Sequence, residues 1–188
     1  MSAHRARAIG LIAVLLSAWL VLAGAATAQA AVVINEFMAN NTKTKQDEDG
    51  QFDDWIELFN TSTANASVGG YYMSDQASQP RKWKIPAGTD MGGQQRLLIW
   101  ADGTSPSLPT RPLHAAFRLN AENGELIALY DDKGTTIDVV RFGQQAPDIS
   151  YGRITDGASR WVPLNKPNPL GANGTGGYIP PPSRLLGV

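Results

Sequence analysis

The chain has 188 residues, with 16 lysines and arginines against 17 acidic residues, and it contains no cysteine. The missing cysteines exclude disulfide bonds, thiolate metal sites and a cysteine nucleophile. The slightly acidic charge does not favour binding to nucleic acid, and the length suits one ordinary domain that folds without covalent cross-links.

The first 30 residues have the three-part form of a secretory signal peptide. A basic start with His4, Arg5 and Arg7 precedes the apolar stretch Ile9–Leu22, and small residues at cleavage-site spacing follow up to Ala30. A retained membrane anchor is the alternative, but about 15 apolar residues are fewer than the roughly 20 that span a bilayer. We therefore expect a helical signal peptide that is removed on export. The mature protein would be secreted, in the medium, the periplasm or at the cell surface, and would have no membrane span.

Mass spectrometry of protein recovered from the medium or the periplasm should find an N-terminus between Gln29 and Val32. The small residues before this point are the kind that signal peptidases accept at a cleavage site. Recovery of mature protein that still begins with Met1 to Arg7 would contradict the expected processing.

Short stretches with alternating apolar residues, typical of β-strands, begin directly after this segment. Val33–Met38 is the first, and the polar, glycine-containing stretch Asn40–Asp54 is expected to be a loop. Trp55–Asn60 is the second strand. Its alternation places Ile56 and Leu58 on one face and its other large side chains on the opposite face.

Three further strands are expected in the middle of the chain. Val68–Asp75 contains the pair Gly69-Gly70, which indicates a bulge or a close backbone approach. Arg81–Lys84 mixes basic residues with a tryptophan, as nucleic-acid surfaces do, but we interpret it as an edge strand. Its lysines would block sheet-to-sheet aggregation while Trp83 fills the core. Arg96–Trp100 is apolar on both faces and is expected to lie deep in the fold.

Turn signals separate the strands of the second half. Asn123-Gly124 suits the left-handed angles of a tight hairpin between its two flanking strands, and Asp131–Gly134 and Asp156-Gly157 mark two later turns. About nine short strands, without helical periodicity after the signal peptide, predict an all-β sandwich. Its inner faces would carry Ile56, Leu58, Leu97 and Ile99. The strands expected around the later turns are Ala115–Leu119, Glu125–Tyr130, Ile137–Phe142, Ser150–Ile154 and Arg160–Val162.

The predicted organisation has three parts. Residues 1–30 are the signal peptide, residues 31–173 the β-sandwich domain, and residues 174–188 a flexible tail rich in glycine and proline.

Three blocks of residues carry a resemblance to a known family. They are Ile34–Ala39 followed by an acidic loop and Asp54–Asn60; Gly70–Asp75 with Trp83-x-x-Pro86-x-Gly88 and Leu97–Ala101; and Asp148–Gly157 with Trp161. Together they resemble the bacterial lamin-tail domain family. The resemblance implies an immunoglobulin-like β-sandwich of exported bacterial proteins, a binding module without catalytic chemistry. The chain departs from the family pattern near its end, where Leu170 stands between proline and glycine.

Asp47, Asp49 and Asp53 are the candidate metal ligands, because they supply oxygen atoms of the kind that calcium prefers. The EF-hand pattern fails, since placing Gly50 at its sixth position puts Lys45 at the first, where an acid is needed. A solvated acidic loop without an ion is the alternative. Calcium is thus the one cofactor that the sequence suggests.

Glu36 and Glu57 are candidate paired carboxylates, because they lie on strands that are expected to be neighbours, and such pairs serve hydrolysis when they are about 5 to 10 Å apart. Carboxylates among apolar residues more often pair with arginine, and Arg141 and Arg153 are available. His114 is the single histidine after residue 30, which excludes a multi-histidine zinc site, and we expect it to be an ordinary surface residue. A Gly-x-Ser-x-Gly nucleophile motif is absent from the sequence.

The leading interpretation is an exported, non-catalytic binding or adhesion-type module that presents loops to a protein or polysaccharide partner. The alternative is a small secreted, metal-assisted hydrolase that uses strand and loop carboxylates. A convergent polar pocket would separate the two, because a hydrolase needs one and a binding module does not.

Overall fold

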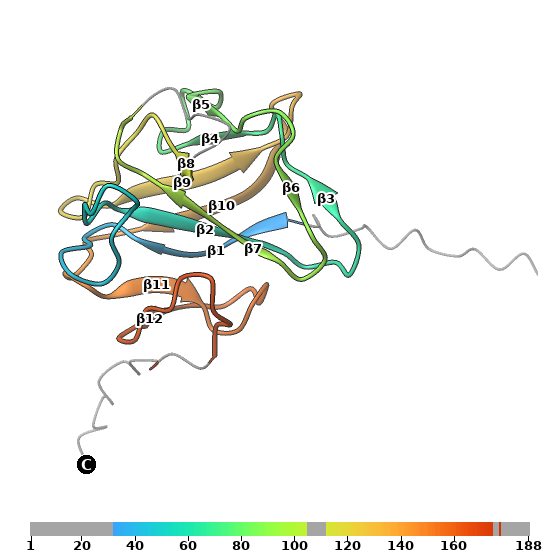
Figure 1. Cartoon of the computed structure of the whole chain (residues 1–188). Helices are drawn as coiled ribbons and strands as arrows, with labels where there is room; N and C mark the ends of the chain where they lie inside the picture. The colour runs from blue at the N-terminus through green and yellow to red at the C-terminus, as the bar shows by residue number, and fades with distance from the viewer. Residues whose placement is uncertain (1–31, 105–111, 175–176, 178–188) are drawn as a thin grey trace, which may run out of the picture.

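Two β-sheets packed face to face make up most of the protein (Figure 1). The structure, a computed structural model, describes residues 32–104, 112–174 and 177. The expected signal peptide and most of the expected tail lie outside these residues. Strands and turns alone occur within them, which confirms the all-β, immunoglobulin-like sandwich. No helix in these ranges is long and apolar enough to cross a membrane.

The larger sheet has six strands in the order β12-β11-β1-β2-β7-β8, and the smaller sheet has four in the order β10-β9-β4-β5. β3 and β6 pair separately as a two-stranded ribbon. The count of twelve exceeds the expected nine because β3, β6 and β8, each of two residues, have no counterpart among the expected strands. The strands are β1 (Val32–Met38), β2 (Trp55–Asn60), β3 (Ala66–Ser67), β4 (Tyr72–Ser74), β5 (Trp83–Lys84), β6 (Asp90–Met91), β7 (Arg96–Trp100), β8 (Leu113–His114), β9 (Glu125–Tyr130), β10 (Thr136–Phe142), β11 (Ser150–Arg153) and β12 (Trp161–Leu164).

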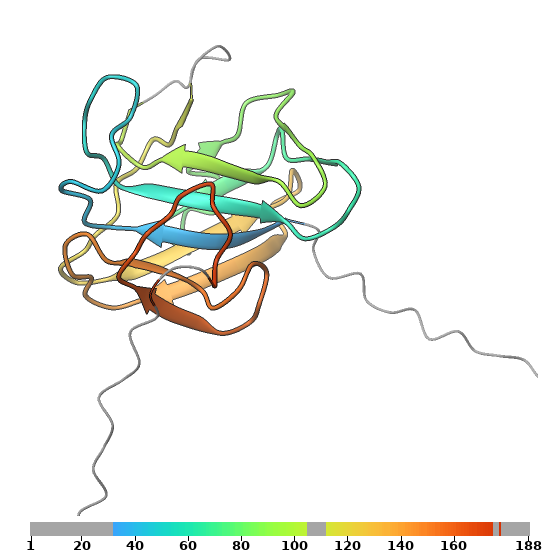
Figure 2. The same cartoon turned by 60° about the horizontal axis from the view of Figure 1, so that its bottom comes forward.

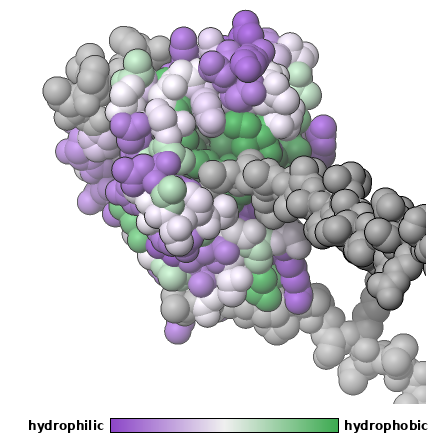
Figure 3. Space-filling view, turned by 90° about the vertical axis from the view of Figure 1, so that its right-hand side faces the viewer, coloured by the Kyte–Doolittle hydropathy of each residue, from purple (hydrophilic) through white to green (hydrophobic). Residues whose placement is uncertain are grey.

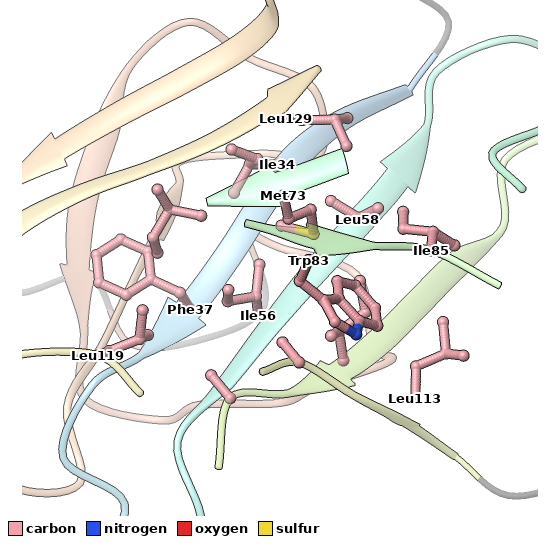
Figure 4. Close-up of a cluster of buried hydrophobic side chains, with 14 of the residues drawn as sticks. Ile34, Phe37, Ile56, Leu58, Met73, Trp83, Ile85, Leu113, Leu119 and Leu129 are labelled. Atoms are coloured by element: carbon pink, nitrogen blue, oxygen red, sulfur yellow. The ribbon is translucent and has the colours of Figure 1, made fainter. Parts of the chain in front are cut away.

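The hydrophobic core lies between the two sheets. Ile56, Leu58 and Ile99 have no exposed surface, and the partly buried Leu97 packs against the same cluster. The four inner-face positions predicted from the alternation are therefore confirmed. Trp83, from the smaller sheet, lies over Ile56 and Leu58 and closes this part of the core (Figure 4).

A β-bulge in β1 decides which of its side chains face the core. The pairing of β1 with β2 shifts between Ile34 and Glu36, so that Glu36 lies opposite Glu57. Ile34 and Phe37 both enter the core although two residues separate them, which simple alternation does not allow. The bulge thus turns Glu36 to the outer face of the larger sheet.

Strand β7 is less buried than its apolar sequence indicated. Arg96, Leu97 and Leu98 are only partly buried, and full burial is confined to Ile99 and Trp100. The reason is that β8, its outer neighbour, has two residues and pairs in parallel with the end of β7 alone. The first half of β7 therefore lies at an open edge of the sheet.

Two of the three predicted turns join the expected strands, and the third does not. The turns at Asp131–Gly134 and Asp156-Gly157 join β9 to β10 and β11 to β12, as predicted. The hairpin at Asn123-Gly124 is wrong: Gly124 has the expected left-handed φ of 67°, but Ala115–Leu119 does not pair with β9. A turn dipeptide specifies the local reversal of the chain and leaves the choice of partner strand to the tertiary packing.

The edge-strand interpretation of Arg81–Lys84 is confirmed. β5 ends the smaller sheet, with Trp83 buried and Lys84 exposed. The close backbone approach at Gly69 is confirmed as well, because a Cβ atom there would lie 2.8 Å from the amide nitrogen of Gly88. Residues 69 and 88 can approach in this way only because position 69 has no side chain.

Large apolar side chains are rarely exposed. Figure 3 views the protein from the right-hand side of Figure 1, where an apolar area lies among polar residues. The large apolar side chains that are exposed in the described ranges are those of Phe52, Val139 and Leu170. They come from a loop, from β10 and from the chain after β12, and Leu170 is the most exposed at 51%.

The chain after β12 crosses the outer face of the larger sheet in front of β1 and β2 (Figure 2). The side-chain amide of Asn173 donates hydrogen bonds to the carbonyl oxygens of Asn35 (3.2 Å) and Arg153 (2.8 Å). The carbonyl of Gly177 accepts one from the amide of Asn165 (2.9 Å). This crossing segment explains why β1 and β2 are buried on both of their faces.

Candidate functional site

A pocket of about 480 Å³ lies on the outer side of the larger sheet, beside the exposed half of β7. Its apolar lining consists of Leu98, Trp100, Pro112 and Leu170, and it also borders Leu97, whose side chain packs against the core between the sheets. The volume falls in the range of about 300 to 1,000 Å³ that is usual for ligand sites. The partial burial of β7 is thus explained by the pocket: the crossing segment and the acidic loop border this strand without covering it completely.

Polar residues surround the apolar lining. Lys45, Asp47 and Glu48 come from the loop between β1 and β2, and Arg96 comes from the start of β7. The guanidinium of Arg96 forms a salt bridge with Asp156, so its charge is already compensated. The loop side of the pocket thus carries two carboxylates, those of Asp47 and Glu48, against the single ammonium group of Lys45, so its net charge is negative.

Leu170 is held beside the pocket in an unusual conformation. Its φ angle is 71°, a left-handed value that a leucine seldom adopts. Its backbone amide donates a hydrogen bond of 2.6 Å to Oε2 of the buried Glu57. Backbone strain of this kind persists only where the surroundings enforce it, and it is common at binding sites. A buried carboxylate in β2 thus positions an exposed side chain that lies 113 residues later in the chain.

The paired carboxylates Glu36 and Glu57 face each other across β1 and β2, as predicted, and both are fully buried. Burial raises the pKa of each to about 7, although hydrogen bonds from Ser150 to Glu36 (2.5 Å) and from Asn35 to Glu57 (2.9 Å) act in the opposite direction. Arg96 lies 4.0 Å from Glu57.

The expected pairing of these glutamates with Arg141 or Arg153 is wrong. Arg153 instead forms a salt bridge of 2.7 Å with Asp138 and donates a hydrogen bond to the carbonyl of Ile34. The bulge in β1 causes the difference, because it places Glu36 on the outer face, toward Ser150.

The three aspartates proposed as calcium ligands have separate local roles. Asp47 closes a tight turn, because its Oδ1 accepts hydrogen bonds from the amides of Asp49 (2.9 Å) and Gln51 (2.8 Å). Asp53 lies 3.8 Å from the guanidinium of Arg118. Within the described residues, the metal-ligating atoms that do gather belong to Asp47, Glu48 and His114. Of the three aspartates, only Asp47 is part of this group.

His114 is not the ordinary surface residue expected from the sequence. It is 8% exposed, and its Nδ1 lies 2.8 Å from Oδ2 of Asp102, while its Nε2 lies 3.1 Å from Oε1 of Glu48. Burial by itself would lower the pKa of His114, but the hydrogen bonds and charges of Asp102 and Glu48 outweigh it and raise that pKa. The parallel pairing of β8 with β7 brings this histidine beside Trp100.

The sequence carried little indication of this cluster. Glu48 and His114 are 66 residues apart, and Asp102 is separated from His114 by a stretch rich in serine and proline. One local feature does support the cluster, namely the contact between Asp102 and Thr104, two residues later. The hydroxyl and amide of Thr104 donate hydrogen bonds of 2.5 and 2.9 Å to Asp102 and orient its carboxylate toward the ring.

The fold and the site together define an immunoglobulin-like β-sandwich with a partly apolar pocket on one sheet, a domain type without enzymatic chemistry of its own. A model of the Lamin Tail Domain family matches residues 25–144, which is more than half of the chain, and the protein belongs to this family. A comparison with curated proteins found no match. The matched range includes the acidic loop, β7 and His114. β11, β12 and Leu170 follow it, although β11 pairs directly with β1.

Proposed function

We propose that this protein is an exported, non-catalytic binding module whose pocket beside β7 receives an apolar side chain of a protein partner. The observation that carries this proposal is the leucine-lined pocket with Leu170 held at its border in a strained conformation. An apolar anchor inserted into such a pocket is a common centre of protein recognition. The strain at Leu170 is understandable if the exposed side chain takes part in binding.

The lining favours a protein over a polysaccharide. Sugar hydroxyl groups need hydrogen-bond partners when they leave water, and the side chains of Leu98, Leu170 and Pro112 offer none. Aromatic stacking would need an exposed ring, but Trp100 is only 3% exposed. The carboxylates of Asp47 and Glu48 further favour a partner that carries a lysine or arginine next to its apolar anchor.

Catalysis by the paired glutamates has less support. Neither Glu36 nor Glu57 has exposed surface, so a substrate has no access to their carboxyl groups. The pocket beside them is lined mainly by apolar side chains, whereas a hydrolase needs convergent polar groups. We therefore favour binding without turnover.

Selection of peptides from a displayed random library on the purified protein should enrich sequences with a large apolar residue beside a basic one. The Leu170→Gly variant should bind a selected peptide about tenfold more weakly or worse, because burial of a leucine contributes roughly 1.5 to 3 kcal/mol. Glycine accepts the positive φ angle, so this change removes the side chain without adding backbone strain.

Val139→Ala is the matched control, because it shortens an exposed apolar side chain on β10 and should leave the peptide affinity unchanged. Equal affinity of the Leu170→Gly variant and the unchanged protein, or binding only to polysaccharides on a glycan array, would refute the proposal. Cleavage of the selected peptides that is lost in Glu57→Gln would establish the hydrolase instead.

A further inference from the structure

Asp47, Glu48 and His114 bring three metal-ligating side chains to one point of the structure. One ligand atom from each lies within 4.8 Å of the other two, and Nε2 of His114 is 3.1 Å from Oε1 of Glu48. Around a tetrahedral zinc ion with bonds of about 2.1 Å, neighbouring ligand atoms are about 3.4 Å apart. The observed spacing approaches this value, and Glu48 is an exposed side chain that can adjust.

The surroundings of the histidine have the form that metal-binding histidines usually show. Asp102 takes the Nδ1 side of the ring, at 2.8 Å, and leaves Nε2 facing the carboxylate of Glu48, at 3.1 and 3.3 Å from its two oxygen atoms. A carboxylate on the far nitrogen of a ligating histidine holds the ring in one orientation and strengthens it as a ligand. Asp102 is itself held by Thr104, and the residues His114 and Asp102 are each 8% exposed. The histidine is thus prepositioned by the fold and does not depend on the loop for its orientation.

We propose that Asp47, Glu48 and His114 form a binding site for a divalent transition-metal ion, with zinc as the best-fitting ion. The three side chains supply one nitrogen and two oxygen ligands, and the remaining coordination position is left to water or to a bound ligand. Asp47 and Glu48 also border the pocket beside β7, so the ion would lie at its edge.

The ligand set distinguishes this site from the calcium loop suggested by the sequence. Calcium takes six to eight oxygen ligands, whereas an imidazole nitrogen favours zinc and related ions. The local charge also suits a cation, because Asp53 adds a further carboxylate. Arg118 lies 3.8 Å from Asp53, but its side chain is 70% exposed, so water screens its positive charge. The alternative is that His114 and Glu48 form an ion pair that binds no metal. A metal titration distinguishes this alternative from the proposed site.

Isothermal titration of zinc chloride into the protein, purified without a histidine tag, should show one ion bound per chain. His114→Gln and Glu48→Gln should each weaken zinc binding by about tenfold or more, since each removes one of three ligands. Asp49→Asn, in the same loop but outside the cluster, should change the dissociation constant less than about twofold. Zinc should also shift the imidazole signals of His114 in NMR spectra, and magnesium at equal concentration should not.

Three results would overturn the proposal: no zinc binding by the unchanged protein, equal zinc affinity of His114→Gln, or calcium binding that Asp49→Asn abolishes. The Glu48→Gln variant decides the matter if His114→Gln fails to fold, because Glu48 is exposed and its loss leaves the core intact. The titration needs no partner, so its outcome is independent of the peptide selection and can fail while the binding function stands.

Discussion

Replacing Leu58 by alanine should lower the free energy of unfolding by roughly 2 to 5 kcal/mol. Leu58 has no exposed surface and lies on the inner face of β2, opposite Ile34 in β1 and Leu97 in β7. Three adjacent strands and the tryptophan of β5 surround it, so the space left by the truncation cannot close without moving both sheets (Figure 4). Urea denaturation followed by tryptophan fluorescence measures the change.

Val139→Ala serves as the control for this truncation as well. Val139 lies on β10 and is 45% exposed, so shortening its side chain should lower the free energy of unfolding by less than about 0.5 kcal/mol. If Leu58→Ala also costs less than about 0.5 kcal/mol, Leu58 does not face the core and the assignment of the faces of β2 is wrong.

The stability of the protein should fall as the pH rises from 5 to 8, because of the buried pair Glu36 and Glu57. Burial raises the pKa of both from 4.5 to about 7, so the folded protein holds protons that the unfolded chain has released. The stabilising contribution of the protonated forms is complete below about pH 4.5 and is lost as the pH rises through about 7. The loss should be roughly 2 to 4 kcal/mol over this range, allowing for interaction between the two groups.

Glu36→Gln isolates this effect, because glutamine resembles the protonated acid and can still accept the hydrogen bond from Ser150. The variant should be more stable than the unchanged protein at pH 8 and nearly equal to it at pH 5. Glu122→Gln, on an exposed turn, should keep the original pH dependence. Thermal melts at both pH values test this. A stability that is constant or rising from pH 5 to 8, or a Glu36→Gln variant with an unchanged slope, would contradict the assignment.

His114 contributes to the same pH profile in the same direction. Its pKa is raised by Asp102 and Glu48, so the stability that its charged form adds is present below its unfolded pKa and is lost as the pH rises through its folded one. Asp148 acts oppositely, because hydrogen bonds from Thr42 and neighbouring residues lower its pKa to about 2 against the effect of desolvation. Its contribution is lost only in strong acid, below the range of the test.

Local patterns in the sequence were sufficient for most of the fold. Alternation in Trp55–Asn60 predicted the inner faces of Ile56 and Leu58, and turn residues placed the β9–β10 and β11–β12 connections. These features depend on neighbouring residues alone, because side chains alternate along any strand and glycine adopts left-handed angles in any turn. The resemblance to the lamin-tail family rested on the same strands and is confirmed by the family match.

The candidate site depended on contacts between distant residues, which no local pattern expresses. The bulge in β1 turned Glu36 outward, the parallel pairing of β8 brought His114 to Asp102 and Glu48, and the crossing segment set Leu170 on Glu57. By itself, then, the sequence determined the β-sandwich and its inner faces, because strand alternation and turn chemistry act within a few residues. Which distant polar groups meet was decided only by the tertiary structure. Glu48 and His114 are 66 residues apart, and Glu57 and the backbone amide of Leu170 are 113 apart, and sheet order, register and packing bring them together.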